Sequence, residues 1–324
     1  MPTNFPTPTT IAMSPGTEIV FGVLLVVAVA LIRRRAGSGN AQPLPHPPTA
    51  ADRLVGRAAA LGALLALVGW ISGSVSEMYL VVPPAVTWWH YAAPIAGAAV
   101  GAAVLLAIAT RTPTRVEAPV APTTRRTWAT FANRQELGAV TATVAALIVV
   151  SVLAGFASSR VDGAWYSRLD IDGGGSTSFY GWTYGLPVLV AAAVLVGLGW
   201  TALSVDARRP FRHPSAVALE TAKRRASAAA LVRLSFGALL LSLGGALSFI
   251  GGSGMGSTGF GIPGVGMFVW SAGYSSFAPT IFWLGWGMQV VAVAVLVRIT
   301  VDGLRRRHAS TTPAAGLQED AVVA

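Results

Sequence analysis

Residues 137–156 read LGAVTATVAALIVVSVLAGF, twenty consecutive residues without a charged side chain. An α-helix rises 1.5 Å per residue, so this stretch reaches about 30 Å, the thickness of the hydrocarbon core of a bilayer. Charged residues bound it, with Arg134 and Glu136 before it and Arg160 after it. The stretch therefore predicts a membrane-spanning helix.

Six further apolar stretches follow the same pattern along the chain. They are Ile19–Ile32, Ala58–Val75, Tyr91–Thr110, Gly185–Val205, Leu234–Ile250 and Pro279–Val297. The first has only 14 uncharged residues and spans a bilayer only if Met13–Thr17 extend it. We predict an all-α, polytopic integral membrane helix bundle with seven transmembrane helices, or six if the first does not span.

The composition excludes several classes of protein. Of the 324 residues, 53% are hydrophobic and 11% are charged, whereas soluble domains carry about 25% charged residues. The chain has no cysteine, which excludes disulfides, thiolate nucleophiles, Cys-ligated zinc and iron–sulfur clusters. Frequent Ala, Val, Gly and Arg with few Lys indicate a high-GC bacterium, and hence a multi-pass protein of the plasma membrane.

The basic residues set the predicted orientation. Of the 23 Lys and Arg residues, all but Arg160 and Arg168 can be placed on one side of the membrane. Cytoplasmic loops retain Lys and Arg, so we predict an outside N-terminus and a cytoplasmic C-terminus. This placement explains the net charge of +10 without nucleic acid as a partner. The bilayer itself is the expected partner, through anionic headgroups worth about 1 kcal/mol per basic residue.

The spans and their flanks divide the chain into seven predicted parts. They are an N-terminal reverse-orientation membrane anchor (1–35), a Pro-rich cytoplasmic linker (36–52), helical hairpin 1 (53–115), a second cytoplasmic linker (116–133), helical hairpin 2 (134–212), a basic interfacial helix at Ser215–Ala230 with helical hairpin 3 (213–307), and a disordered cytoplasmic tail (308–324). Residues 251–273, with nine glycines and no charge, predict either a flexible outer loop or a segment that re-enters the membrane.

The three hairpins resemble one another and could be repeats. Their return helices begin near Pro94, Pro187 and Pro279, each after aromatic residues, and their outgoing helices share a glycine near the start (Gly62, Gly138 and Gly237). A true repeat would arrange three helix pairs around a central seam, on an axis along the membrane normal. The alternative is that proline favours first turns and aromatics favour interfaces, which gives similar helix starts without duplication.

The spans offer little chemistry. No Asp, Glu, Lys, Arg or His occurs from Leu234 to Val297, and ion-coupled carriers usually need intramembrane charge. Gln289, near the middle of the last span, predicts either a pore contact or an interhelical hydrogen bond, and the second reading is favoured. Gly97 and Gly101 form a GxxxG pattern that predicts close helix packing, within the chain or with a copy of it.

The remaining candidate contacts lie at the two membrane faces. On the outer face they are Glu77, Trp88, Trp89, His90, Asp170 and Asp172. The Asp170–Ser176 stretch resembles the start of a calcium loop but lacks the later glutamate, so a turn is expected. On the cytoplasmic face Arg208, Arg209, Arg212 and Arg224 are predicted partner contacts. We predict no catalytic residue, no metal site and no cofactor.

Three functions remain open at this stage. The first is a transport-related, permease-like membrane subunit without its own nucleotide site, working with a cytoplasmic ATPase or another membrane subunit. The second is a non-catalytic envelope scaffold or partner-binding membrane protein, which includes a homo-oligomer. The third, a membrane enzyme, is disfavoured because the outer face lacks an acid–base constellation.

Overall fold

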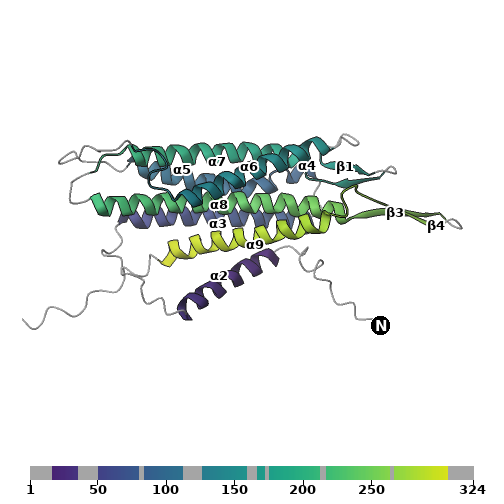
Figure 1. The fold of residues 1–324 in the computed structure, drawn as a ribbon, viewed down its shortest axis with the longest axis horizontal. Coiled ribbons are helices and arrows are strands. Elements are labelled where there is room, and N and C mark those ends of the chain that lie inside the picture. Colours follow the sequence, from purple (N-terminus) through teal and green to yellow (C-terminus); the bar gives the residue numbers. More distant parts are fainter. Residues whose placement is uncertain are drawn as a thin grey trace, which may run out of the picture.

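The computed structural model describes residues 17–35, 50–79, 84–111, 126–158, 166–171, 175–211, 217–262 and 266–305. Helices dominate this part of the chain (Figure 1). In chain order they are α2 (Thr17–Arg35), α3 (Ala50–Tyr79), the short α4 (Pro84–Thr87), the 3-10 helix η1 (His90–Ala92), α5 (Ala93–Arg111), α6 (Arg134–Ala157), α7 (Trp182–Arg208), α8 (Val217–Met255) and α9 (Ala278–Arg305). Most of both predicted linkers, the predicted tail, Asp172 and Arg212 lie outside the described residues.

Six of these helices are long and apolar enough to cross a membrane, namely α3, α5, α6, α7, α8 and α9. They confirm the predicted helical membrane bundle. The apolar stretch of α2, Thr17–Ile32, is shorter than the other six. α2 packs along α9, where a Cβ added to Gly22 would lie 2.6 Å from the side chain of Val293. A seventh span by α2 therefore stays a prediction.

α8 occupies the centre of the bundle. It contacts α3, α5, α6, α7 and α9, and most of its side chains from Leu231 to Ala246 are buried. The predicted arrangement of three helix pairs around a central seam is therefore wrong, because one helix fills that place. The aligned glycines also differ, since Gly62 and Gly237 pack against neighbouring helices whereas Gly138 has nothing within 4 Å. Duplication of the sequence itself stays a prediction.

α8 also corrects the predicted interfacial helix. Residues 217–255 form one continuous helix of 39 residues, not a basic helix at Ser215–Ala230 followed by a separate span. The physical reason lies in the junction, where Ala228-Ala229-Ala230-Leu231 contains no helix breaker and favours continuation. The basic first turns of α8 therefore extend the bundle in line with the span instead of lying flat on the membrane surface.

Glycines bring pairs of helices into close contact. A Cβ added to Gly101 of α5 would lie 2.8 Å from Gly62 of α3, and one added to Gly97 would lie 2.5 Å from the main chain of Ala66. The predicted GxxxG pattern thus packs α5 on α3 within the chain. α8 and α9 cross in the same way, since a Cβ on Gly244 would lie 2.7 Å from the carbonyl oxygen of Gly285.

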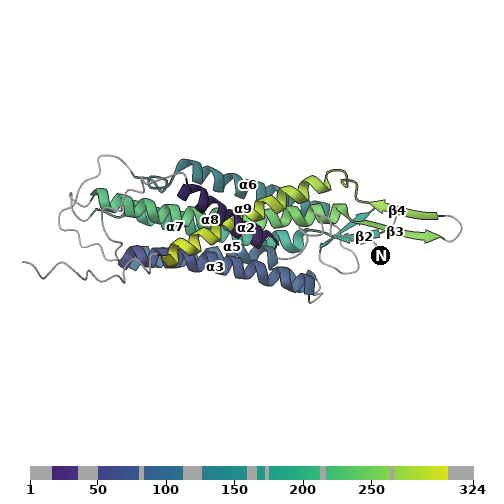
Figure 2. The same ribbon diagram turned by 90° about the horizontal axis from the view of Figure 1, so that it is seen from below.

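Two β-hairpins depart from the all-α prediction. β1 (Arg168–Ile171) pairs antiparallel with β2 (Gly175–Ser178), and β3 (Ser257–Ile262) pairs antiparallel with β4 (Gly266–Ser271). Figure 2 shows β3 and β4 projecting beyond the ends of the helices. This arrangement favours the outer-loop alternative for residues 251–273 over re-entry into the membrane. α8 continues to Met255, and a ribbon with β-favouring Phe, Val and Trp residues follows it.

The two ends of the bundle differ in charge. The end that carries β1–β4 is called the hairpin end, and the opposite end is called the basic end (Figure 1). α3, α6 and α8 begin at the basic end, and α2, α5, α7 and α9 finish there. Arg168 in β1 is the basic residue at the hairpin end among the described residues. The other described Lys and Arg residues lie toward the basic end, which agrees with the predicted segregation of charge.

Candidate functional site

Six aromatic rings from four parts of the chain meet inside the bundle, toward the hairpin end. This aromatic cluster consists of Trp70 in α3, His90 and Tyr91 in η1, Tyr180 just before α7, Tyr184 in α7, and Phe249 in α8. All except Phe249 are buried, with exposed fractions of 4% or less. The cluster therefore belongs to the interior, although its residues lie near the ends of the spans.

Tyr91 is the centre of the cluster. Its ring stacks on His90 with centroids 4.5 Å apart and on Phe249 with centroids 5.9 Å apart. The rings of Tyr180 and Tyr184 approach it edge-on, at 5.4 and 5.3 Å. Such stacked and edge-to-face pairs add about 0.5–1.5 kcal/mol each beyond burial. The cluster thus joins α3, η1, α7 and α8 at one level of the bundle.

Tight main-chain packing makes room for these rings. A Cβ added to Gly73 would collide with the imidazole of His90, and one added to Gly245 would collide with the indole of Trp70. Both glycines lie in helix interiors, where glycine costs about 1 kcal/mol relative to alanine. Their presence follows from the space that the rings need.

Short hydroxyl side chains and one carboxylate lie within hydrogen-bond distance of several polar atoms of the cluster. Trp70 donates from Nε1 to Glu18 Oε1 of α2 at 3.0 Å. The hydroxyls of Ser151 and Tyr180 lie 3.3 Å apart, and those of Thr87 and Tyr184 lie 3.5 Å apart. Burial raises the pKa of Tyr180 well above its ordinary value. Its phenol therefore stays protonated and can act as a hydrogen-bond donor at neutral pH.

The cluster is built for packing and hydrogen bonding. Among the described residues, no group of three or more His, Cys, Asp or Glu side chains could hold a metal ion. His90 points into the bundle, where its Nε2 lies 3.4 Å from Ser74 Oγ and its ring 4.8 Å from that of Trp70. Its side chain is therefore buried, whereas the sequence predicted a contact at the outer face. The Glu77 side chain lies outside the described part of the chain.

The other predicted outer residues do not join the cluster. Trp88 is about half exposed, and the carbonyl of Trp89 accepts from the N–H groups of Ala92 and Ala93, which begins α5. Asp170 is exposed in β1 opposite Ser176, and residues 172–174, on which the predicted turn falls, lie outside the described residues. These side chains form no shared site with His90.

Gln289 forms a hydrogen bond between helices. Its Nε2 donates to Ser248 Oγ of α8 at 2.7 Å, and the Gln289 side chain is 5% exposed. Ser248 Oγ in turn lies 3.4 Å from the carbonyl oxygen of Phe282. This geometry favours the interhelical reading of Gln289 over the pore reading.

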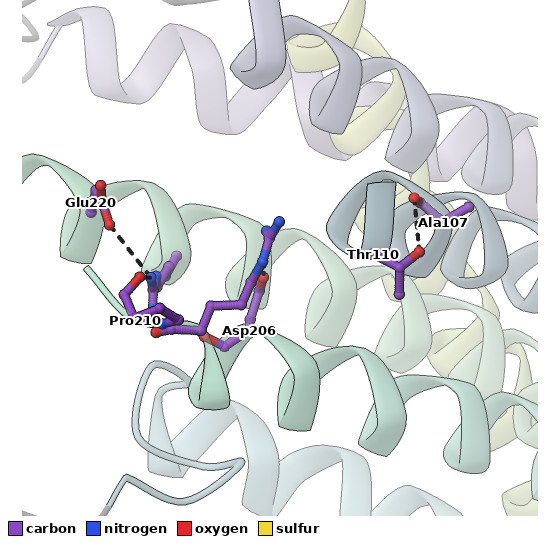
Figure 3. Close-up of polar contacts among 7 residues, drawn as sticks. Ala107, Thr110, Asp206, Pro210 and Glu220 are labelled. Atoms are coloured by element: carbon purple, nitrogen blue, oxygen red, sulfur yellow. Dashed lines mark hydrogen bonds and ion pairs between the residues drawn. The ribbon is translucent and has the colours of Figure 1, made fainter. Parts of the chain in front are cut away.

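At the basic end, Arg224 joins α7 to α8. Arg224 and the residues around it form a group that we call the α7–α8 corner. Its members are Asp206, Arg209, Pro210, Phe211, Glu220 and Arg224. The guanidinium donates to the carbonyl oxygens of Asp206 at 3.0 Å, Arg209 at 2.8 Å and Pro210 at 3.0 Å. Figure 3 shows Asp206 and Pro210 beside Glu220 of α8. Arg224 thereby binds carbonyls that α7 leaves unpaired at its C-terminus.

Aromatic rings hold the same guanidinium in place. Arg224 lies 4.7 Å from the ring centroid of Phe211 and 5.6 Å from that of Phe131, while Arg126 lies 4.0 Å from Phe211. Because Arg224 is buried and bound within the chain, its predicted role as a partner contact is wrong. Arg208 is exposed and Arg209 half-buried, so both remain candidates for that role.

Sequence reasoning missed several of these residues. Neither Glu18 nor Trp70 is among the residues that the sequence predicts to form a site. Tyr91, Tyr180 and Tyr184 were noticed as aromatics before prolines, but they were assigned to the membrane interface. No family model matches the chain, and neither the curated proteins nor the solved structures contain a match to it. Its function is therefore argued from its own residues.

Proposed function

We propose that this chain is a non-catalytic, multi-pass plasma-membrane protein that holds a partner protein, with its basic end in the cytoplasm and its hairpin end outside. The observation that carries this proposal is the filled interior. α8 occupies the centre of the bundle, and its neighbours meet it through glycine contacts and aromatic rings. A scaffold needs such a fixed interior, whereas a carrier needs one that opens.

The lack of charge along α8 and α9 supports the same proposal. No Asp, Glu, Lys, Arg or His occurs from Leu234 to Val297, which covers the spanning part of α8 and all but the last turns of α9. Gln289 of α9 and Ser248 of α8 bind each other. Substrate and ion pathways usually carry ionisable groups. The polar groups that remain accessible lie at the two ends.

Affinity purification from native membranes tests this proposal. The tagged chain, extracted in a mild detergent, should retain a second protein in a fixed ratio, measured by quantitative mass spectrometry. Purified chain in liposomes should show no solute flux above empty liposomes. Absence of any stoichiometric protein, or a specific flux by the chain alone, would overturn the proposal.

A transport-related subunit driven by a cytoplasmic ATPase is the second candidate, and one observation favours it. The α7–α8 corner is rigidly built around Arg224, and exposed Arg208 and Arg225 flank it. A fixed basic corner suits a cytoplasmic ATPase that transmits a conformational change to the membrane subunit. If an ATP-binding protein co-purifies and the double variant Arg208→Glu/Arg225→Glu releases it, this candidate replaces the first.

A further inference from the structure

The β3–β4 ribbon stands apart from the helices with both outer edges unpaired. Among the described residues it forms a separate two-stranded sheet. Each strand has six residues, so the ribbon reaches about 20 Å past Met255 at about 3.4 Å per residue. An isolated two-stranded hairpin is marginally stable in water. A third strand would supply the main-chain hydrogen bonds that each edge lacks.

The two hairpins of the molecule differ in how their edges are protected. Proteins usually protect free edges with charges or prolines. β1 has both Arg168 and Asp170 exposed, and Arg168 also donates to Ser176 Oγ across the ribbon at 3.2 Å. β3 (STGFGI) and β4 (GMFVWS) contain neither a charge nor a proline. Within the part of the chain that the structure describes, one ribbon is thus left open to pairing.

β4 is the better template of the two strands. Glycine in a strand interior weakens it, and β3 has Gly259 and Gly261 in its interior. β4 has its one glycine at the first position and then Met267, Phe268, Val269 and Trp270. Aromatic and β-branched residues favour strands. A further strand is therefore expected at the free edge of β4.

We propose that the free edge of β4 binds an extended, uncharged segment of another polypeptide outside the membrane, which adds as a third strand. This inference rests on the proposed partner-binding function and names the partner's chemistry. Main-chain hydrogen bonds supply the affinity in strand addition. β3 and β4 themselves carry no charged residue that could pair with a charged strand. The segment is therefore uncharged.

A second copy of this chain fits the edge less well. Copies inserted in one membrane point their β4 strands in the same direction, so β4 could pair with β4 only in parallel. Parallel pairs occur almost entirely in sheets whose two faces are covered. Pairing of β4 with β3 of a copy would be antiparallel but would propagate from copy to copy without closing. The test therefore includes self-pairing as an outcome.

Photo-crosslinking in native membranes tests the edge directly. The photoreactive residue p-benzoylphenylalanine is placed at Met267, Phe268, Val269 or Trp270, with Thr177 of β2 as the control position. A strand added at the edge lies beside every β4 residue, so all four positions should give one protein adduct and Thr177 none. Docking on one face of the ribbon would instead label alternate positions on both strands, and that result would overturn the inference.

Proline variants provide the second measurement. Successive N–H groups of β4 point alternately toward β3 and toward the free edge. One of Phe268→Pro and Val269→Pro should therefore lower the adduct yield at Trp270 at least tenfold while the rest of the protein keeps its thermal stability. Thr177→Pro in β2 should leave the yield unchanged. Unchanged yields in both β4 variants would overturn the inference.

The outcomes separate this inference from the function on which it rests. If a partner co-purifies but gives no adduct from β4 and survives both proline variants, strand addition is wrong while partner binding stands. If no protein co-purifies, partner binding fails first. Adducts that contain only lipid, or only a second copy of the chain, overturn the proposal of a different polypeptide.

Discussion

Replacement of Arg224 by methionine should destabilise the basic end of the bundle. The guanidinium makes three hydrogen bonds to main-chain carbonyls at 2.8–3.0 Å and lies 3.4 Å from Glu220. Methionine has a similar length and no donor, so packing is largely kept while these bonds are lost. Hydrogen bonds to charged groups contribute about 1.5–3 kcal/mol each. Water reaches the freed carbonyls at this helix end, so the expected loss is about 3 kcal/mol rather than the full sum.

Two matched variants separate charge from geometry. Arg225→Met removes an exposed arginine from the next position, and its effect should stay within about 0.5 kcal/mol. Arg224→Lys keeps the charge but loses the planar fork that reaches three carbonyls at once. Relative to Arg224→Met, it should recover less than half of the lost free energy of unfolding. The three variants differ by single side chains on the same helical turn.

Unfolding in mixed micelles of increasing SDS fraction measures the free energy, and amide hydrogen exchange locates the change. Exchange should rise at residues 206–211 and stay near wild type at the aromatic cluster. Equal stability of Arg224→Met and Arg225→Met would refute the structural role of Arg224. Full recovery by Arg224→Lys would show that charge alone matters and that the fork geometry does not.

Three further predictions follow from packing, titration and topology. Gly245→Ala should lower the free energy of unfolding in SDS titration by about 2 kcal/mol, because its Cβ meets a buried indole. Gly197→Ala, whose Cβ has nothing within 4 Å, should raise it by up to about 1 kcal/mol. Equal effects of the two variants would contradict the packing. Burial raises the pKa of Tyr274 to about 12 from an ordinary value of about 10. Because the folded pKa is the higher one, its contribution to stability is complete below pH 10 and falls between about pH 10 and 12, a dependence that Tyr274→Phe should remove from alkaline unfolding curves. The chain has no cysteine, so an impermeant maleimide added outside intact cells should label Ser178→Cys and not Ala222→Cys, and the reverse pattern would invert the proposed orientation.

The number and position of the long helices could be predicted from the sequence, because a bilayer demands uninterrupted apolar length. The identity of the central helix could not be predicted. A helix that faces lipid and a helix that is buried in protein are both apolar, so their compositions are alike. Small residues were the available signal. α8 has Gly237, Gly244 and Gly245 against its neighbours, whereas Gly197 of α7 and Gly138 of α6 face open space.

The errors in the candidate site share a physical cause. Arg224 was assigned to the surface because it is charged, yet unpaired carbonyls at a helix end can bind a buried guanidinium. His90 was assigned to the headgroup level because it is polar, yet stacking and a serine hydroxyl hold it inside. The β3–β4 ribbon was hidden by its glycines, although Pro263-Gly264 between two uncharged six-residue runs is a turn signal.

The continuity of α8 has a mechanical consequence. One helix of 39 residues, about 58 Å long at 1.5 Å per residue, runs from the α7–α8 corner to Met255, and only Gly256 separates it from β3. Arg224 binds the end of α7 near the start of this helix, and Phe249 packs in the aromatic cluster near its other end. The ribbon at the hairpin end and the α7–α8 corner at the basic end are therefore joined by one uninterrupted helix.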